Sequence, residues 1–323
     1  MVTLKDLAKE LNVSVSTVSK ALSDSHEISK ETKQKILTLA QEKQYTPNNI
    51  AINLRRKETK TLGVIIPNIF NHFYTKILYG IESEARKNGY KTIISISNET
   101  FIAEKEGLSY FSNGCVDGVL MAPSEESEML NQTKHILELR KKEIPFVFFD
   151  RYFDGLDVDK VVIDDYDAAK NAIEYFTNSG KKNILVVSML KNLWIGKLRR
   201  EGALTAEGID IIESESEEEI EFQLNRKLLT QNVDAILALD ELSGIISLNL
   251  VRTLTFEVPK DVSIISFSQG ILSEYSHPKL STVNQHAQLI GANAVKLLLR
   301  RLKNRNPDPV TNVVKSTLEI HGT

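Results

Sequence analysis

The sequence has a single cysteine, Cys115, and no uninterrupted apolar run that approaches the ~18 residues of a transmembrane helix. A lone thiol excludes an internal disulfide and suits a reducing compartment. The first residues, 1–6, include Lys and Asp and lack the continuous apolar stretch of a signal peptide. These absences predict a cytoplasmic protein that has no membrane partner.

Sites for metals, nucleotides and catalysis are also missing. The histidines show no metal-ligand spacing, and there is no glycine-rich loop of the Walker or dinucleotide-binding type. Acidic pairs such as Asp164–Asp165 are explained as easily by helix capping as by acid–base chemistry. We therefore expect no cofactor, no metal and no catalytic residue, and the chain is not predicted to be an enzyme.

Charge is distributed unevenly along the chain. Residues 1–60 hold 11 Lys and Arg against 7 Asp and Glu, which gives +4, whereas the remainder holds 29 against 36, which gives −7. A basic head on an acidic body is the pattern expected when contact with nucleic acid is confined to one end. Many helical domains are mildly basic, so this asymmetry alone is weak support.

The basic head reads as three short helices. Thr3 and Asp6 have capping-box spacing before a helical apolar repeat, and Ser14 and Ser29 are good caps for a second and a third helix. Two short helices joined by about three residues and braced by a third are typical of a helix-turn-helix. The second helix has a face rich in Ser and Thr, and short hydroxyl side chains let a helix approach phosphates and base edges. A solvated face of a small helical bundle explains the composition equally well.

The head resembles that of the lactose-repressor (LacI) family. The runs that match the family signature are Val2 to Ala8, Asn12 to Leu22, Ile28 to Thr32, and Tyr45 to Asn48. The resemblance implies that Val15, Ser16 and Lys20 read bases. The full set of DNA-binding residues that it implies is Thr3, Ser14, Val15, Ser16, Thr17, Ser19, Lys20, Tyr45, Asn48, Ala51 and Leu54.

Leu54 lies among polar and basic neighbours and has no obvious local core to enter. The family resemblance implies a hinge helix at about 48–56, with Leu54 as a wedge in the DNA minor groove. Nine residues fall below the ~12–15 at which an isolated helix persists in water, so a second hinge and DNA would have to stabilise it. Paired hinges imply a homodimer on a pseudo-palindromic operator, with an easily unstacked step at its centre.

Residues 61–323 alternate between apolar strand-like runs and helical stretches. Predicted strands include 62–66, 92–96, 116–121, 145–149, 161–163, 184–187, 235–239 and 262–267, and helices are expected near 73–88, 101–113 and 126–142. This alternation predicts parallel sheets with crossover helices, and the number of strands suggests two similar lobes.

The body also resembles the LacI family, and through it a periplasmic sugar-binding fold. Matching runs are Gly63 to Ile69, Gly80 to Glu82, Val116 to Leu120, Val258 to Ile264, and His277 to Val283. The expected architecture is a helix-turn-helix head (1–58) plus an α/β two-lobed periplasmic-binding-protein-like body. The resemblance implies a first lobe of 61–161 and 286–311 and a second of 162–285 and 312–323.

Polar residues follow several predicted strands, where ligands of open α/β sheets bind. Helix capping is the simpler explanation for each one alone, but the set favours a cleft. The resemblance implies that the cleft is lined by Asn71, Phe73, Ser124, Asp150, Arg199, Asp240 and Ser268. Ser268 stands where the family usually has a carboxylate, and the helix after Arg199 is shorter than usual. Trp194 is either a substitute stacking surface or, more simply, part of the packing.

The resulting prediction is a DNA-binding transcription regulator, a repressor that acts as a dimer under control of a small effector, a sugar or sugar derivative. One alternative is a regulator whose cleft has lost small-molecule binding and answers to a protein partner. A sugar-binding protein without a DNA role is the other alternative.

Overall fold

The computed structural model describes residues 2–45, 58–304 and 308–323, and the chain divides into two compact units, Met1–Thr59 and Lys60–Thr323. The predicted hinge, with Asn48, Ala51 and Leu54, lies outside the described residues. Within the described ranges, no helix is both long and apolar enough to cross a bilayer.

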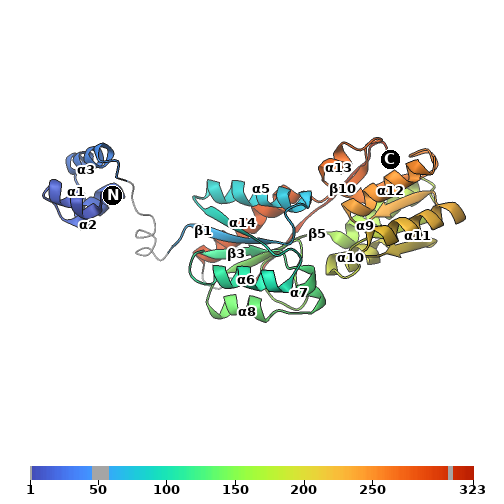
Figure 1. Cartoon of the computed structure of the whole chain (residues 1–323), viewed down its shortest axis with the longest axis horizontal. Coiled ribbons are helices and arrows are strands. Elements are labelled where there is room, and N and C mark those ends of the chain that lie inside the picture. Colours follow the sequence, from blue (N-terminus) through green and yellow to red (C-terminus); the bar gives the residue numbers. More distant parts are fainter. Residues whose placement is uncertain (1, 46–57, 305–307) are drawn as a thin grey trace. The chain divides into compact units, whose positions relative to one another are not determined.

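The first unit contains the three predicted helices, α1 (Leu4–Glu10), α2 (Val15–Leu22) and α3 (Lys30–Glu42) (Figure 1). The capping box forms as predicted: the Thr3 hydroxyl accepts from the Asp6 amide, and the Asp6 carboxylate accepts from the Thr3 amide. Ser14 and Ser29 cap the next two helices through their hydroxyl groups, each of which accepts from the amide three residues later. Each cap satisfies amides that a helix start leaves without partners and contributes about 1 kcal/mol.

A single small core holds these helices together. Its fully buried members come from all three of them and include Leu7, Val18 and Ile36. Burying an aliphatic side chain of this size contributes about 1.5–3 kcal/mol. Because α2 contributes Val18, Ala21 and Leu22 to this core, its opposite face is left to solvent.

The second unit begins with a six-stranded sheet in the order β11 (Thr311–Val314), β5 (Lys160–Ile163), β4 (Phe146–Phe149), β3 (Gly118–Met121), β1 (Thr61–Ile66) and β2 (Lys91–Ile96). All of its neighbouring strands are parallel. Helices α5 (His72–Lys87) and α14 (Ala287–Lys303) cover one face, and α6 (Phe101–Phe111) and α8 (Lys134–Lys141) the other (Figure 1).

Both faces of this sheet are buried, which explains the continuous apolar runs. In β1, Val64 and Ile66 join the core with α5 and α14, while Ile65 joins the core with α6 and α8. A strand presents alternate residues to opposite faces, so a doubly covered strand needs apolar residues at every position.

Helices α5 and α14 pack backbone to backbone because a glycine stands at each point of contact. A Cβ atom at Gly80 would lie 2.1 Å from the carbonyl oxygen of Gln288, and one at Gly291 would lie 2.2 Å from that of Ile77. No other residue type fits at these positions without moving the helices apart.

The second sheet has the order β12 (Thr317–Glu319), β10 (Ser281–Asn284), β9 (Ser263–Phe267), β8 (Ala235–Ala238), β6 (Ile184–Ser188) and β7 (Ile209–Glu213). Only the β10–β12 pair is antiparallel among its described neighbours. The helices around it are α9 (Asp165–Asn178), α10 (Trp194–Ala203), α11 (Glu217–Thr230) and α12 (Glu241–Thr253). The predicted two-lobed α/β fold with parallel-dominated sheets is confirmed.

The chain passes between the two sheets three times, from β5 to α9, from β10 to α14 and from β11 to β12. The first sheet includes residues up to Ile163 and Val314, slightly beyond the first-lobe boundaries that the sequence suggested. These short edge segments are fixed by pairing between β5 and β11, which local sequence does not reveal.

The single helix predicted near 126–142 is wrong. The segment forms α7 (Glu125–Met129) and α8, with a break in which Asn131 adopts φ 47°. The left-handed conformation is favourable for Asn and ends a helix. Four strands, β7, β10, β11 and β12, were not predicted, since polar residues interrupt their apolar pattern.

Candidate functional site

The first unit presents an exposed polar face on α2. Ser14, Val15 and Ser16 are exposed, and Val15 has 40% of its surface accessible. The Ser14 hydroxyl lies 2.7 Å from that of Ser16 and accepts a hydrogen bond from the Thr17 amide at 3.0 Å. Small hydroxyl and aliphatic side chains thus stand at the start of α2, where the backbone can come close to another surface.

The cation of this face, Lys20, is already paired. Its ammonium group contacts the carboxylate of Glu27, which lies in the connection between α2 and α3, and both side chains are about half exposed. Exposed pairs of this kind contribute little to stability. A phosphate or a base acceptor would therefore displace Glu27 at small cost.

The other predicted DNA-binding residues of the head have structural contacts as well. Thr3 belongs to the capping box of α1, Ser14 caps α2, and Tyr45 packs partly buried against the head core. Ser19 and Thr17 are half-buried on α2. Val15 and Ser16 of the predicted set are exposed on α2, and neither residue takes part in the cap of that helix.

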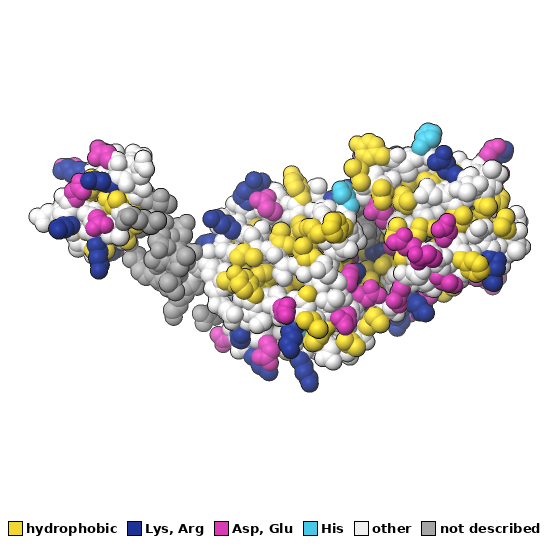
Figure 2. Space-filling view, in the orientation of Figure 1, with side chains coloured by type: hydrophobic (Ala, Val, Ile, Leu, Met, Phe, Trp, Pro, Cys, Tyr) yellow, Lys and Arg dark blue, Asp and Glu magenta, His cyan; other side chains and the backbone are white. Residues whose placement is uncertain are grey.

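The second unit contains a cavity of about 70 Å³ between its two sheets, in the hollow visible in Figure 2. Six of the seven residues predicted to line a cleft meet there: Asn71, Phe73, Asp150, Arg199, Asp240 and Ser268. They come from the carboxyl ends of strands in both lobes and from the helices that follow. The structure thus brings together residues that lie up to two hundred positions apart.

Three of these polar side chains are engaged within the protein. Asn71 Oδ1 accepts from the Phe73 amide at 3.0 Å, and the Asp240 carboxylate accepts from the amides of Ser243 and Met189, both at 2.8 Å. Ser268 Oγ donates to Ser273 Oγ at 2.7 Å. Helix capping and cleft lining are therefore combined in Asn71 and Asp240.

Ser124 is not among the residues that line this cavity. It is fully buried, caps α7, and donates from its amide to Glu104, whose other carboxylate oxygen contacts His135 Nε2 at 2.5 Å. The Glu104 side chain has no exposed surface, so it needs these donors. Ser124 thus belongs to a buried network that holds α6, α7 and α8 together.

Arg199 and Asp165 form a buried ion pair at the cavity. Arg199 Nε donates to Asp165 Oδ1 at 2.7 Å, and Nη1 donates to the Leu239 carbonyl at 2.7 Å. The guanidinium group also lies 4.3 Å from the Phe267 ring centroid. Burial raises the pKa of Asp165 to about 6 even though Arg199 opposes that shift.

Asp150 lies on the other wall of the cavity with unusual backbone geometry. Its φ is 62°, a left-handed conformation that Asp tolerates better than most residues, and its Oδ2 accepts from the Tyr74 hydroxyl at 2.7 Å. Burial raises the pKa of this carboxyl group. The neighbouring Arg151 forms a bidentate pair with Glu99 at 2.7 and 3.0 Å.

Sequence reasoning missed several residues of this cavity, namely Tyr74, Arg151, Glu241 and Gln285. Arg151 and Glu241 follow directly after the predicted Asp150 and Asp240, so their place at strand ends was a usable signal. Tyr74 and Gln285 carried no such signal.

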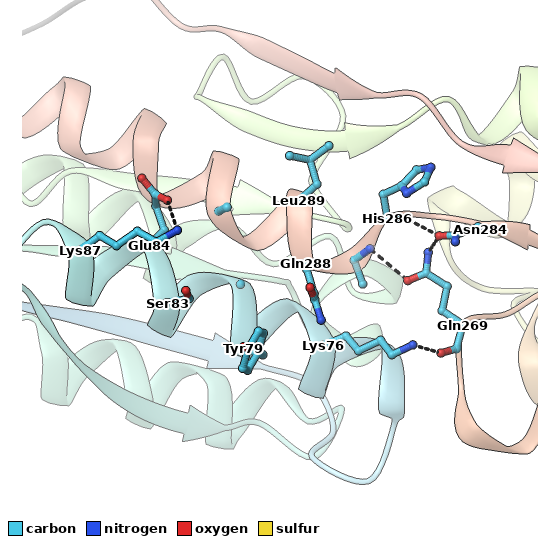
Figure 3. A pocket seen from close by; sticks show the side chains of 13 residues that line it. Lys76, Tyr79, Ser83, Glu84, Lys87, Gln269, Asn284, His286, Gln288 and Leu289 are labelled. Carbon is cyan, nitrogen blue, oxygen red and sulfur yellow. Dashed lines mark hydrogen bonds and ion pairs between the residues drawn. The ribbon is translucent and has the colours of Figure 1, made fainter. Parts of the chain in front are cut away.

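A larger cavity of about 470 Å³ lies beside one edge of the lobe crossing, between α5 and the start of α14 (Figure 3). There Lys76 of the first lobe contacts the backbone oxygen of Gln269 of the second. The Gln269 side chain contacts Asn284, as Figure 3 shows, and it also accepts from the Ala287 amide at 3.1 Å. Gln269 also lines the smaller cavity, so one residue connects the cleft to the crossing segment.

The lobes are also joined through α7 and the start of α10. The Trp194 amide donates to Glu128 at 3.1 Å, and its indole donates to the Tyr152 hydroxyl at 2.9 Å. Trp194 is absent from the lining of the 70 Å³ cavity. The interpretation of Trp194 as a packing residue is thus favoured over a stacking surface for a ligand.

Glu128 makes this contact sensitive to pH. Burial raises its pKa from 4.5 to about 7, so protonation is easier in the folded than in the unfolded chain. The free energy of unfolding should therefore fall as pH rises from about 4.5 to about 7, by on the order of 2 kcal/mol. Glu128→Gln keeps the acceptor for Trp194 and should flatten that part of the pH curve in denaturant titrations.

The exposed Glu82→Gln variant on α5 is the matched control and should follow the wild-type curve. If the free energy of unfolding varied with pH in the same way for Glu128→Gln and for the wild type, the pH dependence would not come from Glu128.

The chain thus combines a small helical head that has an exposed polar helix with a two-lobed α/β body that has an internal cleft. Residues 3–48 match the family model of bacterial regulatory proteins of the lacI family, and residues 173–323 match a periplasmic binding protein-like domain. Catabolite control protein A of Priestia megaterium is 31% identical over 95% of this chain and 94% of its own length. The chain belongs to the LacI family of DNA-binding transcriptional regulators.

Solved structures agree on the fold. A lac repressor dimer bound to operator and an anti-inducer superposes with a TM-score of 0.86 at 20% identity, covering 100% of this chain and 98% of the repressor chain. A complex of the regulator CelR with cellobiose has a TM-score of 0.71 at 22% identity over 100% and 99% of the two chains. The family confirms the prediction of a regulator rather than an enzyme.

Proposed function

We propose that this protein is a repressor that binds a pseudo-palindromic operator as a homodimer and that a small effector in its cleft sets its affinity for DNA. The exposed start of α2 is the observation that supports the DNA-reading role, because its small side chains leave the backbone free to enter a major groove. The similar fold of the lac repressor dimer on its operator supports the dimeric arrangement.

Selection of bound fragments from genomic DNA, followed by gel shift, tests this proposal. The expected product is a site with two related half-sites, bound by two copies of the chain. Recovery of sequences with no common motif would contradict it.

Within this proposal, Lys20 helps to read bases. Lys20→Ala should broaden base preference within each half-site, with about 1–3 kcal/mol less discrimination at the affected position. Sequencing of DNA selected by the variant measures this. Lys35→Ala, which removes an exposed cation paired with Glu31 on α3, is the matched control. An unchanged profile for Lys20→Ala would contradict base reading by this residue.

The effector proposal rests on the cleft. Six predicted lining residues converge on one cavity, and the three strand crossings between lobes form a hinge that can change the angle between them. Gln269 lines the cavity and also contacts the segment that crosses between the lobes. A ligand in the cavity can thus alter the angle between the lobes through this residue. Ligand and operator must then alter each other's affinity by the same factor. The CelR complex with cellobiose supports a carbohydrate effector.

The alternative, a regulator that answers to a protein partner, is favoured by one observation. The cavity of about 70 Å³ is far below the ~300–1,000 Å³ of usual ligand pockets. Under this alternative, a thermal-shift screen of sugars and phosphosugars would show no stabilisation, and Arg199 variants that remain folded would still regulate.

A further inference from the structure

The cleft has an excess of negative charge at its wall. Its lining includes three carboxylates, Asp150, Asp240 and Glu241, and two guanidinium groups. Both cations already have carboxylate partners: Arg151 is held by Glu99 at 2.7 and 3.0 Å, and Arg199 by Asp165 at 2.7 Å. Neither Arg carries an uncompensated charge toward an anionic ligand.

Atoms of three residues at this cavity make no hydrogen bond with any described residue, and one of them is Arg151 Nε, which lies 3.9 Å from Asp150 Oδ2. Glu241 Oε1 is buried and makes no hydrogen bond with any described residue. Gln285 is only 5% exposed, lines the cavity, and its side-chain amide makes no hydrogen bond within the described ranges. Buried polar atoms in native proteins are nearly always satisfied, so Glu241 Oε1 and Arg151 Nε are expected to gain partners when the cleft is occupied, and Gln285 can offer a further hydrogen bond.

The space around Glu241 is provided by Gly270. A Cβ atom at position 270 would lie 1.8 Å from Glu241 Oε1, so any other residue would displace the carboxylate. The Glu241 side chain therefore keeps its position at the cavity because residue 270 has no side chain.

The kind of ligand follows from these groups. An ionised carboxylate pairs most strongly with a charged donor, whereas a phosphate or carboxylate ligand would meet like charges in a partly buried site. Burial raises the pKa of Asp150, although Arg151 and the hydrogen bond from the Tyr74 hydroxyl favour its charged form. Phe73 lines the same cavity and offers an apolar surface to a ring face.

We propose that the cleft binds a small polyhydroxylated ligand with a protonated amine, as in an amino sugar, and that Glu241 pairs with the ammonium group while Gln285 binds a hydroxyl. This inference rests on the proposed effector function and specifies the class of effector. Because the cavity is small, the lobes part to admit the ligand and close around it.

Thermal shift and calorimetry on the full-length protein at pH 7 test the inference with three matched panels. These are glucose, galactose and mannose, their 2-amino-2-deoxy counterparts, and their 6-phosphates. At least one amino sugar should raise Tm by about 5 °C when present well above its Kd, and its neutral parent and phosphate should not. Greater stabilisation by neutral sugars or phosphates, or none by the amino sugars, overturns the inference.

Variants assign the amine to Glu241. Glu241→Gln, which keeps the shape and removes the charge, should weaken amino-sugar binding at least about tenfold. Gln285→Ala should weaken it as well, whereas Glu221→Gln, on the exposed surface of α11, should not. Unchanged binding by Glu241→Gln overturns the assignment. Gel shifts run in parallel separate the two proposals: operator binding without an amino-sugar response refutes only the ligand, and absent operator binding refutes the proposed function.

Discussion

Leu54→Ala should lower affinity for the selected operator by about 100-fold while leaving affinity for random DNA nearly unchanged. The expectation follows from the sequence and the family resemblance, because residue 54 lies outside the described residues. A leucine wedge that unstacks one step involves a few kcal/mol and opens the groove for further contacts. Binding to random DNA is dominated by phosphate charge, which the substitution does not change.

Arg55→Ala is the matched control for this variant. Loss of a cation should weaken both kinds of binding and lower the salt slope by about 1, whereas Leu54→Ala should keep the slope. Fluorescence anisotropy over a range of salt concentrations measures both. Equal losses on operator and random DNA for Leu54→Ala would refute the wedge.

Arg199→Ala should lower the free energy of unfolding by about 3–5 kcal/mol, because it leaves the Asp165 carboxylate buried without its cation. Asp165 already has a raised pKa, and loss of Arg199 would raise it further. Below a pH of about 6 the Asp165 carboxyl group is protonated in both folded proteins, so the loss of stability should be small there and should grow as pH rises above about 6. Urea denaturation at several pH values measures it.

Two variants test this interpretation. Arg200→Ala, on the same helix but paired with Glu213 at a partly exposed site, should change the free energy of unfolding by no more than about 1 kcal/mol. Adding Asp165→Asn to Arg199→Ala should recover part of the loss, since it removes the unpaired charge. A loss for Arg199→Ala that is independent of pH would contradict the account. Because of this destabilisation, an effector phenotype of Arg199→Ala is informative only under conditions where the variant is folded.

Local signals predicted the three described helices of the head. Thr3, Ser14 and Ser29 cap helices as their types and spacing require, and the apolar repeat that follows each cap selects the buried face. Such interactions join residues three or four positions apart, so the sequence itself contains them. In the body, strands buried on both faces were equally visible, since every position of β1 from Leu62 to Ile66 is buried.

Long-range contacts set the limits of sequence reasoning. Sequence reasoning missed the end of α7 and the pairing of β5 with β11. The end of α7 depends on the backbone conformation of one residue, and β5 pairs with a strand far along the chain. Ser124 looked like a cleft residue because it follows a strand, but the buried Glu104 takes its amide. Which strand-end side chain faces the cavity is decided by neighbours that sequence order does not specify.

The sequence by itself determined the class of this protein: a capped three-helix head with a small polar recognition face, joined to an α/β body of two lobes. These features follow from local periodicity, capping chemistry and a family signature. Only the tertiary structure decided how the cleft is charged. It paired Arg199 with Asp165 and Arg151 with Glu99, and it left Glu241 Oε1 without a hydrogen-bond partner among the described residues. Burial and pairing between distant residues set the chemistry of a site, and they exist only in the folded chain.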